Sequence, residues 1–141
     1  MKKIAVFVFA AMIALTPVAA QALSIGCWDQ WPTVGHQFND KISGYIGFNH
    51  YGNYNNSPTN WYLVKVDYNL AKFGNVQTRA GIDYWWSSPT VDSATELTYG
   101  AYIMAAENLS VGFDITLARF NNIPSSTDIL RCANASVNLF F

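Results

Sequence analysis

A histidine in an asparagine-rich stretch is the part of this chain that comes closest to a catalytic motif. His50 is followed by Asn53, and Ser57 lies further along the same stretch. A histidine can activate a serine hydroxyl as a nucleophile when the two side chains meet. Ser57 would reach His50 only if the intervening loop folded back. We favour the alternative, in which His50 is an interfacial residue at the end of a strand and the chain has no catalytic residue.

Other chemistries find less support in the sequence. His36 and His50 are the only histidines, and neither belongs to a cluster with the spacing of a zinc site. No glycine-rich phosphate loop is present. Without Lys2 and Lys3 the chain has 8 − 2 = 6 basic and 9 acidic residues, a net charge of −3, whereas nucleic acid requires a basic surface. The sequence therefore predicts no metal, no cofactor and no nucleic-acid partner.

Four segments in the middle of the chain alternate between apolar and polar residues, as strands with one apolar face do. These segments are 61–70, 76–86, 95–104 and 109–120. A Lys or Arg on the lipid-facing side of a membrane barrel costs ~2–4 kcal/mol near the midplane, so the charges are expected inside. The charges on the less apolar face are Lys65, Asp67, Arg79, Asp83, Glu96 and Asp114.

We predict that these six side chains form a polar network that fills the lumen. The alternative is a path for protons or cations. Arg119 and Arg131 break the alternation. Both lie near a loop, and we expect their long side chains to reach the lipid headgroups.

Two further strands are predicted at 42–51 and 129–141, which gives six clear strands. A tilted strand needs ~9–11 residues to cross a bilayer. The smallest usual barrel has about eight strands, so 24–31 and 34–40 are expected to add two, with a turn at Trp31-Pro32-Thr33. Otherwise this segment is a plug or a periplasmic arm, or several chains share one barrel.

The connections alternate in length. Segments 71–75 and 105–108 are short, whereas 52–60, 87–93 and 121–128 are longer and rich in Asn, Ser and Pro. Outer-membrane barrels have short periplasmic turns and longer external loops. The alternation therefore favours a barrel over a soluble β-sandwich, which also has strands with one buried face. The aromatic residues expected at strand ends, Tyr51, Trp61, Trp85 and Trp86, favour it as well.

The two ends of the chain carry export signals. Lys2 and Lys3 precede an apolar run at 4–15, and Ala20-Gln21-Ala22 is a small-x-small cleavage site. This pattern is typical of a signal peptide. We expect cleavage after Ala22, so that 1–22 is the signal peptide and 23–141 is one barrel domain; an uncleaved anchor is the alternative. At the other end, apolar residues occupy alternate positions: Ala133, Ala135, Val137, Leu139 and the terminal Phe141.

The terminal strand resembles the last strand of small bacterial outer-membrane β-barrels of the OmpA/OmpX kind. The resemblance implies an all-β, antiparallel up-and-down transmembrane barrel of eight strands. It implies export through the periplasm to the outer membrane, where lipid and lipopolysaccharide would surround the protein. It also implies that the barrel-insertion machinery reads the alternate residues that end in Phe141. The oligomeric state stays open.

A weaker resemblance concerns the stretch around His50, which is similar to the His-x-Ser-Asn element of outer-membrane lipid A deacylases. His50 and Asn53 match the pattern, but Gly52 stands at the position of the nucleophile. Without a hydroxyl at that position His50 has nothing to activate. A lipid A-modifying enzyme therefore remains an alternative to a structural or surface-interaction role, as does a soluble secreted β-sandwich that binds a ligand.

The two cysteines form a predicted disulfide. Cys27 lies near the expected mature start and Cys132 in the last strand. The first and last strands of a closed barrel are neighbours, and the periplasm is oxidising. A Cys27–Cys132 bond would close the seam of the barrel. Two thiols are the alternative, since the Cα atoms must come within ~7 Å to be bridged.

Overall fold

The computed structural model describes residues 23–141 apart from 29–30, 55–56, 90–91, 123–124 and 131–132. The predicted signal peptide, residues 1–22, lies outside the described residues. Within the described part of the chain, no helix has the length and hydropathy needed to cross a membrane. Almost all of it is β-strand. The strands are β1 (Leu23–Trp28), β2 (Trp31–Gln37), β3 (Ile42–Tyr54), β4 (Ser57–Phe73), β5 (Val76–Ser88), β6 (Ser93–Ala106), β7 (Leu109–Asn122), β8 (Ser125–Ile129) and β9 (Ala133–Phe140).

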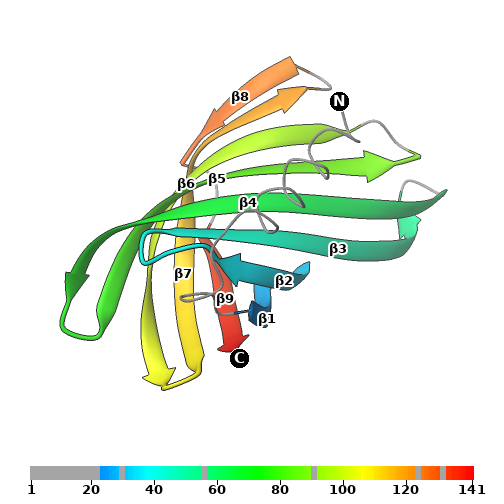
Figure 1. Cartoon of the computed structure of the whole chain (residues 1–141). Coiled ribbons are helices and arrows are strands. Elements are labelled where there is room, and N and C mark those ends of the chain that lie inside the picture. Colours follow the sequence, from blue (N-terminus) through cyan, green and yellow to red (C-terminus); the bar gives the residue numbers. More distant parts are fainter. Residues whose placement is uncertain (1–22, 29–30, 55–56, 90–91, 123–124, 131–132) are drawn as a thin grey trace.

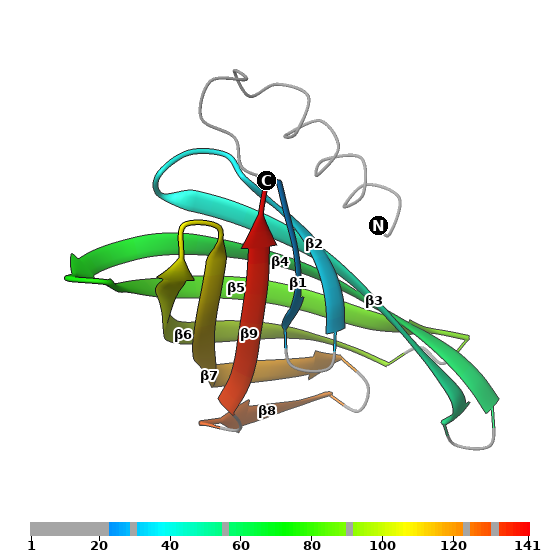
Figure 2. The same cartoon turned by 90° about the horizontal axis from the view of Figure 1, so that it is seen from below.

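The strands form one closed antiparallel sheet (Figures 1 and 2). Strands β1 to β7 each pair with the next along the chain, and β9 pairs with both β7 and β1. Strand β8 pairs with the upper part of β7, so β8 and β9 lie end to end as one interrupted strand. The fold is therefore an up-and-down barrel of eight strands, as the sequence predicted.

A bulge separates β8 from β9. Opposite β7, Ala118 faces Ile129 and Ile115 faces Ala133, so three steps on β7 match four on the other side. The extra residue lies between Ile129 and Ala133, and Leu130 in this interval has a positive φ of 53°. A bulge of this kind bends a strand and increases its twist. β8 and β9 thus pair with successive parts of β7, and the bulge interrupts the ladder between them.

The two faces of the sheet differ sharply in polarity. Along β9 every second residue is buried, and the buried ones are Asn134, Ser136 and Asn138. The outward residues between them are apolar, as on the other strands, where Ile82 is 49% exposed and Phe113 57%. Small soluble proteins normally show the opposite distribution, with apolar side chains inside.

Several predicted boundaries were wrong. Trp28 of β1 pairs with Trp31 of β2, so that Trp31, Pro32 and Thr33 belong to β2 and not to a turn. This arrangement lets Trp28 and Trp31 face each other across the hairpin with both side chains buried. Two predicted loops, 52–60 and 121–128, are mostly strand. Polar side chains hold these hairpins together: Asn121 Nδ2 donates to Ser126 Oγ, for example, at 2.9 Å.

The prediction that Arg119 reaches the headgroups is also wrong. In the β6–β7 ladder Leu97 faces Ala118, whereas Thr98 faces Thr116, so Leu117 is an extra residue. A one-residue bulge reverses the faces of all residues beyond it. Arg119 consequently points into the barrel, while Phe120 is 44% exposed on the outside. Arg131 lies outside the described residues.

Glycines on the inner face make room for the buried charges. A Cβ at Gly81 would overlap the Asp67 carboxylate, and a Cβ at Gly100 would overlap the backbone carbonyl of Phe113 and the Asp114 carboxylate. The flexible end of a side chain can move, but a paired backbone cannot. Gly100 is therefore a position that does not tolerate a methyl group, as is Gly26, where a Cβ would overlap the backbone carbonyl of Val137.

The first prediction concerns this close approach. Gly100→Ala should destabilise the barrel by about 1–3 kcal/mol, because the new methyl group forces β6 and β7 apart. Gly47→Ala is the matched control, since its Cβ would meet Leu63 at 3.3 Å, a contact that a small shift relieves. Urea unfolding of both variants measures the difference. Equal stability of the two variants would contradict the role assigned to Gly100.

Candidate functional site in the barrel interior

The six charged residues expected in the lumen all lie on the inner face of β4, β5, β6 and β7. None of them is more than 3% exposed. Charged side chains are almost never buried to this extent unless they are paired. The contacts that they make divide them into two clusters and one residue between the clusters.

Asp114 on β7 is the centre of the first cluster. Arg79 on β5 binds it with two hydrogen bonds, Nε to Oδ1 at 2.9 Å and Nη2 to Oδ2 at 2.8 Å. Trp28 on β1 donates Nε1–H to the same Oδ2 at 2.9 Å, and the Lys65 ammonium lies 3.4 Å away. A bidentate Arg–carboxylate pair is among the strongest polar contacts in proteins. Asp114 on β7 thus connects to side chains of three other strands, β1, β4 and β5.

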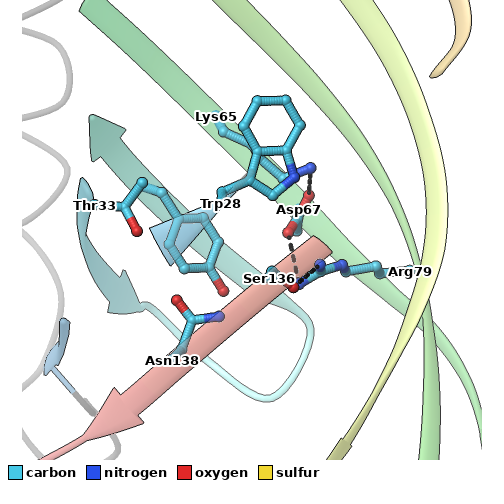
Figure 3. Close-up of a pocket in the computed structure, with 8 residues that line it drawn as sticks. Trp28, Thr33, Lys65, Asp67, Arg79, Ser136 and Asn138 are labelled. Atoms are coloured by element: carbon cyan, nitrogen blue, oxygen red, sulfur yellow. Dashed lines mark hydrogen bonds and ion pairs between the residues drawn. The ribbon is translucent and has the colours of Figure 1, made fainter. Parts of the chain in front are cut away.

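Lys65 and Asp67 on β4 complete this cluster; Figure 3 shows them with Arg79, Trp28 and Ser136 around a small cavity. Lys65 Nζ lies 2.9 Å from Asp67 Oδ1 and donates to Thr98 Oγ1 at 3.1 Å. Its ammonium also lies 5.0 Å from the centre of the Trp28 ring, a cation–π distance. Arg79 reaches Asp67 at 3.3 Å and donates to Ser136 Oγ on β9 at 3.0 Å. The network therefore crosses from β4 to β9.

Glu96 on β6 is the centre of the second cluster. It pairs with Arg119 and accepts hydrogen bonds from Trp85 Nε1 at 3.1 Å and Thr116 Oγ1 at 3.0 Å. The Arg119 guanidinium lies 5.3 Å from the centre of the Trp85 ring. Both oxygens of the Glu96 carboxylate are therefore satisfied by β5 and β7.

Asp83 on β5 lies between the two clusters. Directly across the sheet it faces Lys65 on one side and Glu96 on the other. It is 1% exposed, and within the described part of the chain neither of its carboxylate oxygens has a hydrogen-bond partner. Lys65 is engaged with Asp67 and Asp114, and Arg119 with Glu96. Asp83 is thus the carboxylate for which this network provides no direct contact.

A cluster of aromatic residues lies inside the barrel beside the charges. Trp28, Trp31, Trp61 and Leu63 are buried together, and Trp85 packs against them. Trp61 contacts Trp31 edge to face at 6.5 Å and Trp85 at 5.1 Å between ring centres. The sequence interpretation placed Trp61 and Trp85 at strand ends. Their inward parity brings both into the interior, where Trp61 is buried and Trp85 is half-buried.

Trp86 has the opposite orientation. It has outward parity, but it is only 8% exposed and stacks on Tyr62 at 5.3 Å and Tyr84 at 5.6 Å. Phe48 extends this outer group, 5.5 Å from Tyr62. Amphipathic rings of this kind favour a membrane boundary. The side chain of Tyr51 lies outside the described part of the structure.

A small cavity lies beside the buried charges. It has a volume of about 10 Å³ and lies among Trp28, Thr33, Tyr45, Lys65, Asp67, Arg79, Ser136 and Asn138. This is about the room that one water molecule needs. Among the described residues, no group of three His, Cys, Asp or Glu side chains could hold a metal ion. The arrangement can bind water and hold strands together.

His50 lies at the exposed outer part of β3, away from this network. Its Nδ1 is 2.8 Å from Asn60 Oδ1 on β4. The strands continue as a hairpin in which Ser57 pairs with Tyr54, four residues and therefore ~13 Å beyond His50 along β3. The backbone thus keeps Ser57 away from His50. Gly52 and Asn53 lie on the same strand, but the side chain of Asn53 is not described.

The remaining predicted sites lie at the seam of the barrel. Cys27 is exposed on the outer face of β1. Cys132 lies outside the described residues, so the disulfide stays a prediction. The amide of Phe141 donates to the carbonyl of Leu23 at 2.9 Å, which ties the last residue to the first strand. The alternate apolar residues expected to guide insertion, Ala133, Ala135, Val137, Leu139 and Phe141, are exposed.

Sequence reasoning missed the neutral partners of the network. Trp28, Thr98, Thr116 and Ser136 each bond a buried charge. Parity alone assigns Thr98 and Ser136 to the polar face of their strands. The sequence did not indicate that Trp28 bonds a buried charge, because a tryptophan near a predicted turn is expected at the membrane boundary.

Comparisons of the chain with protein-family models, with curated proteins and with solved structures each returned no match. What the protein does must therefore be inferred from its own residues.

The second prediction separates the two kinds of buried carboxylate. Asp114→Asn should destabilise the barrel by about 3–5 kcal/mol, because it removes the bidentate partner of Arg79 and leaves Asp67 alone to balance the buried charges of Lys65 and Arg79. Asp83→Asn has the same size and burial, but it breaks no direct ion pair and removes a charge from a dry site. We expect its stability to be unchanged or higher. Urea unfolding in detergent micelles measures both, and a loss for Asp83→Asn equal to that for Asp114→Asn would contradict this assignment.

Proposed function

We propose that this protein is a small outer-membrane β-barrel of the OmpA/OmpX kind, with a structural or surface-interaction role and no catalytic activity. The observation that carries the proposal is the reversed polarity of the closed sheet. Lys65, Asp83 and Asp114 are buried inside, while Ile25, Ile82 and Phe113 are about half exposed outside. Only a lipid environment makes this distribution favourable all round the barrel.

The backbone supports the same conclusion. In lipid every N–H and C=O group must be paired within the protein, which only helices and closed barrels achieve. Here β9 pairs with β1, so the central part of the sheet has no free edge. A soluble β-sandwich would have two separate sheets packed face to face. The single closed sheet with a charged interior overturns that alternative.

The filled interior favours a scaffold over a pore. The lumen of an eight-stranded barrel is only wide enough for side chains to fill. Salt bridges and a tryptophan cluster occupy this one. The long β3–β4 and β7–β8 hairpins, rich in Asn, Ser and Thr, are the parts available to meet partners outside the cell. The partners that we propose are outer-membrane lipid, lipopolysaccharide and the insertion machinery.

The lipid A-modifying alternative has less support. His50 faces an asparagine amide, and the backbone keeps Ser57 at a distance. Mass spectrometry of lipid A from cells with and without the protein tests this alternative. Identical acylation is the outcome that we expect.

The third prediction tests membrane residence. Cells that produce the full chain should carry the protein in the outer-membrane fraction, and its unboiled form should migrate differently on a denaturing gel from the boiled form. A closed barrel resists the detergent until heat unfolds it. Asp114→Asn is a useful control, because its shift should disappear at a lower temperature. Recovery in the soluble periplasmic fraction without any heat shift would overturn the proposal.

The fourth prediction concerns conduction. Protein reconstituted into a planar bilayer should add no steady ionic current, because side chains occlude the lumen. Heat-unfolded protein added at the same concentration is the control for unspecific leakage. Stable, cation-selective steps of current would show that the polar interior is a path for ions instead.

A further inference from the structure

The β4–β5 hairpin extends past the neighbouring β2–β3 turn at residues 70–78, which we call the hairpin end (Figures 1 and 2). The β2–β3 turn lies beside Asn69, whose amide donates to the carbonyl of Lys41 at 2.7 Å. The hairpin end belongs to the end of the barrel with the short turns, 74–75 and 107–108. The proposed function assigns this end to the periplasm.

A β-bulge in β4 decides which residues of the hairpin end face outward. Between Asn69 and Lys72, β4 has one residue more than the part of β5 that it faces. Without the extra residue, the alternation that places Tyr68 outside would place Lys72 outside and Phe73 inside. The bulge exchanges the two, because Phe73 faces Val76 on the outer surface. A charged residue thus leaves the outer surface, and a phenylalanine that is 68% exposed joins it.

The backbone at the bulge is hydrogen-bonded by side chains. Thr78 Oγ1 accepts from the Ala71 N–H at 3.1 Å and donates to the Ala71 carbonyl at 3.0 Å. Gln77 Nε2 donates to the same carbonyl at 3.0 Å. Ala71 is exposed, so in water the solvent could make these bonds. In lipid it could not, because every backbone group there must be paired within the protein. The bulge is therefore built in a way that suits an environment without water.

A row of outward apolar residues joins the hairpin end to the rest of the outer surface. Each member of the row directly faces the next, across β4, β5, β6, β7 and β9 in turn. All are between 36% and 68% exposed, and they are Phe73, Val76, Ile103, Val111 and Val137. The surface that the proposed function assigns to lipid thus continues to the hairpin end.

We propose that the hairpin end is an anchor at the lipid boundary of the periplasmic leaflet. The Phe73 ring lies among the acyl chains near the headgroups, and the Lys72 ammonium lies in the aqueous layer. This inference rests on the proposed function. The occupant is lipid and not a second copy of the chain, because the apolar row that leads to Phe73 runs over five strands of the surface that lipid surrounds.

The first part of the test removes the hydroxyl group at the bulge. The full exported chain is folded into phosphatidylcholine vesicles, and its unfolding in urea is measured. Thr78→Val keeps the shape of the side chain but leaves the Ala71 N–H without its acceptor. Where water is excluded, the folding equilibrium constant should fall about tenfold or more. Thr78→Ser keeps a hydroxyl group and should retain most of the stability.

Thr95→Val is the matched control for this loss. Thr95 faces Tyr84 on the outer side of β6, and its hydroxyl group makes no hydrogen bond within the described part of the chain. The same substitution should therefore leave the unfolding midpoint unchanged.

The second part of the test measures where residue 73 lies. An environment-sensitive fluorophore is attached to Phe73→Cys in a variant without the two native cysteines. Ile82→Cys is the reference for the middle of the wall, and Glu107→Cys is the reference for a turn in water. Bromine on the acyl chains of the vesicle should quench the labels at 73 and 82. Iodide in the aqueous phase should quench the label at 107 alone.

The possible results separate the anchor from its alternatives. Iodide quenching at 73 as strong as at 107 would overturn the anchor, as would equal losses for Thr78→Val and Thr95→Val. A label at 73 that neither quencher reaches would overturn it in favour of a second copy of the chain. If bromine does not quench the label at 82, the proposed function itself fails. If Thr78→Val does not fold, the comparison of 73 with 107 still decides.

Discussion

The pairing of every backbone group in a closed sheet is the constraint on which the rest of this structure depends. Once β9 pairs with β1, each strand has one face inside and one outside. Eight strands leave a lumen that only side chains fill. The inner positions must then hold groups that satisfy each other, and Arg79 with Asp114 does so most completely, with two direct hydrogen bonds and support from Trp28 and Ser136.

The buried charges act as cross-links between walls that are distant in sequence. Asp114 on β7 joins β1, β4 and β5, and Glu96 on β6 joins β5 and β7. Gly81 and Gly100 leave the space that these contacts need. Among the residues that the structure describes, the network holds three cations, Lys65, Arg79 and Arg119, against four carboxylates, and Asp83 is the carboxylate without a direct partner. The interior is therefore stabilised by a few strong contacts instead of a uniform core.

Alternation in the sequence was sufficient to predict six strands and the polarity of their faces, because period-two patterns depend only on local geometry. The closed barrel of eight strands was predicted from the size of the smallest usual barrel and from the resemblance of the terminal strand. The alternation gave wrong faces or wrong strand bounds where a β-bulge adds one residue to a strand. The bulge at Leu117 turned Arg119 inward, and the bulge near Leu130 divided the last strand. Trp61 and Trp85 were expected at strand ends, and their parity, which is that of Asp67 and Asp83, brings them into the interior.

Spin-label accessibility along β5 tests the central claim most directly. Single nitroxides at each position from 76 to 86, in a variant without cysteines and reconstituted in lipid vesicles, report contact with oxygen, which dissolves in lipid, and with a water-soluble nickel complex. The even positions, which include Ile82, should be accessible to oxygen and not to nickel. The odd positions, which include Asp83, should be accessible to neither. Even positions that nickel reaches as readily as oxygen would contradict a barrel whose apolar face meets lipid.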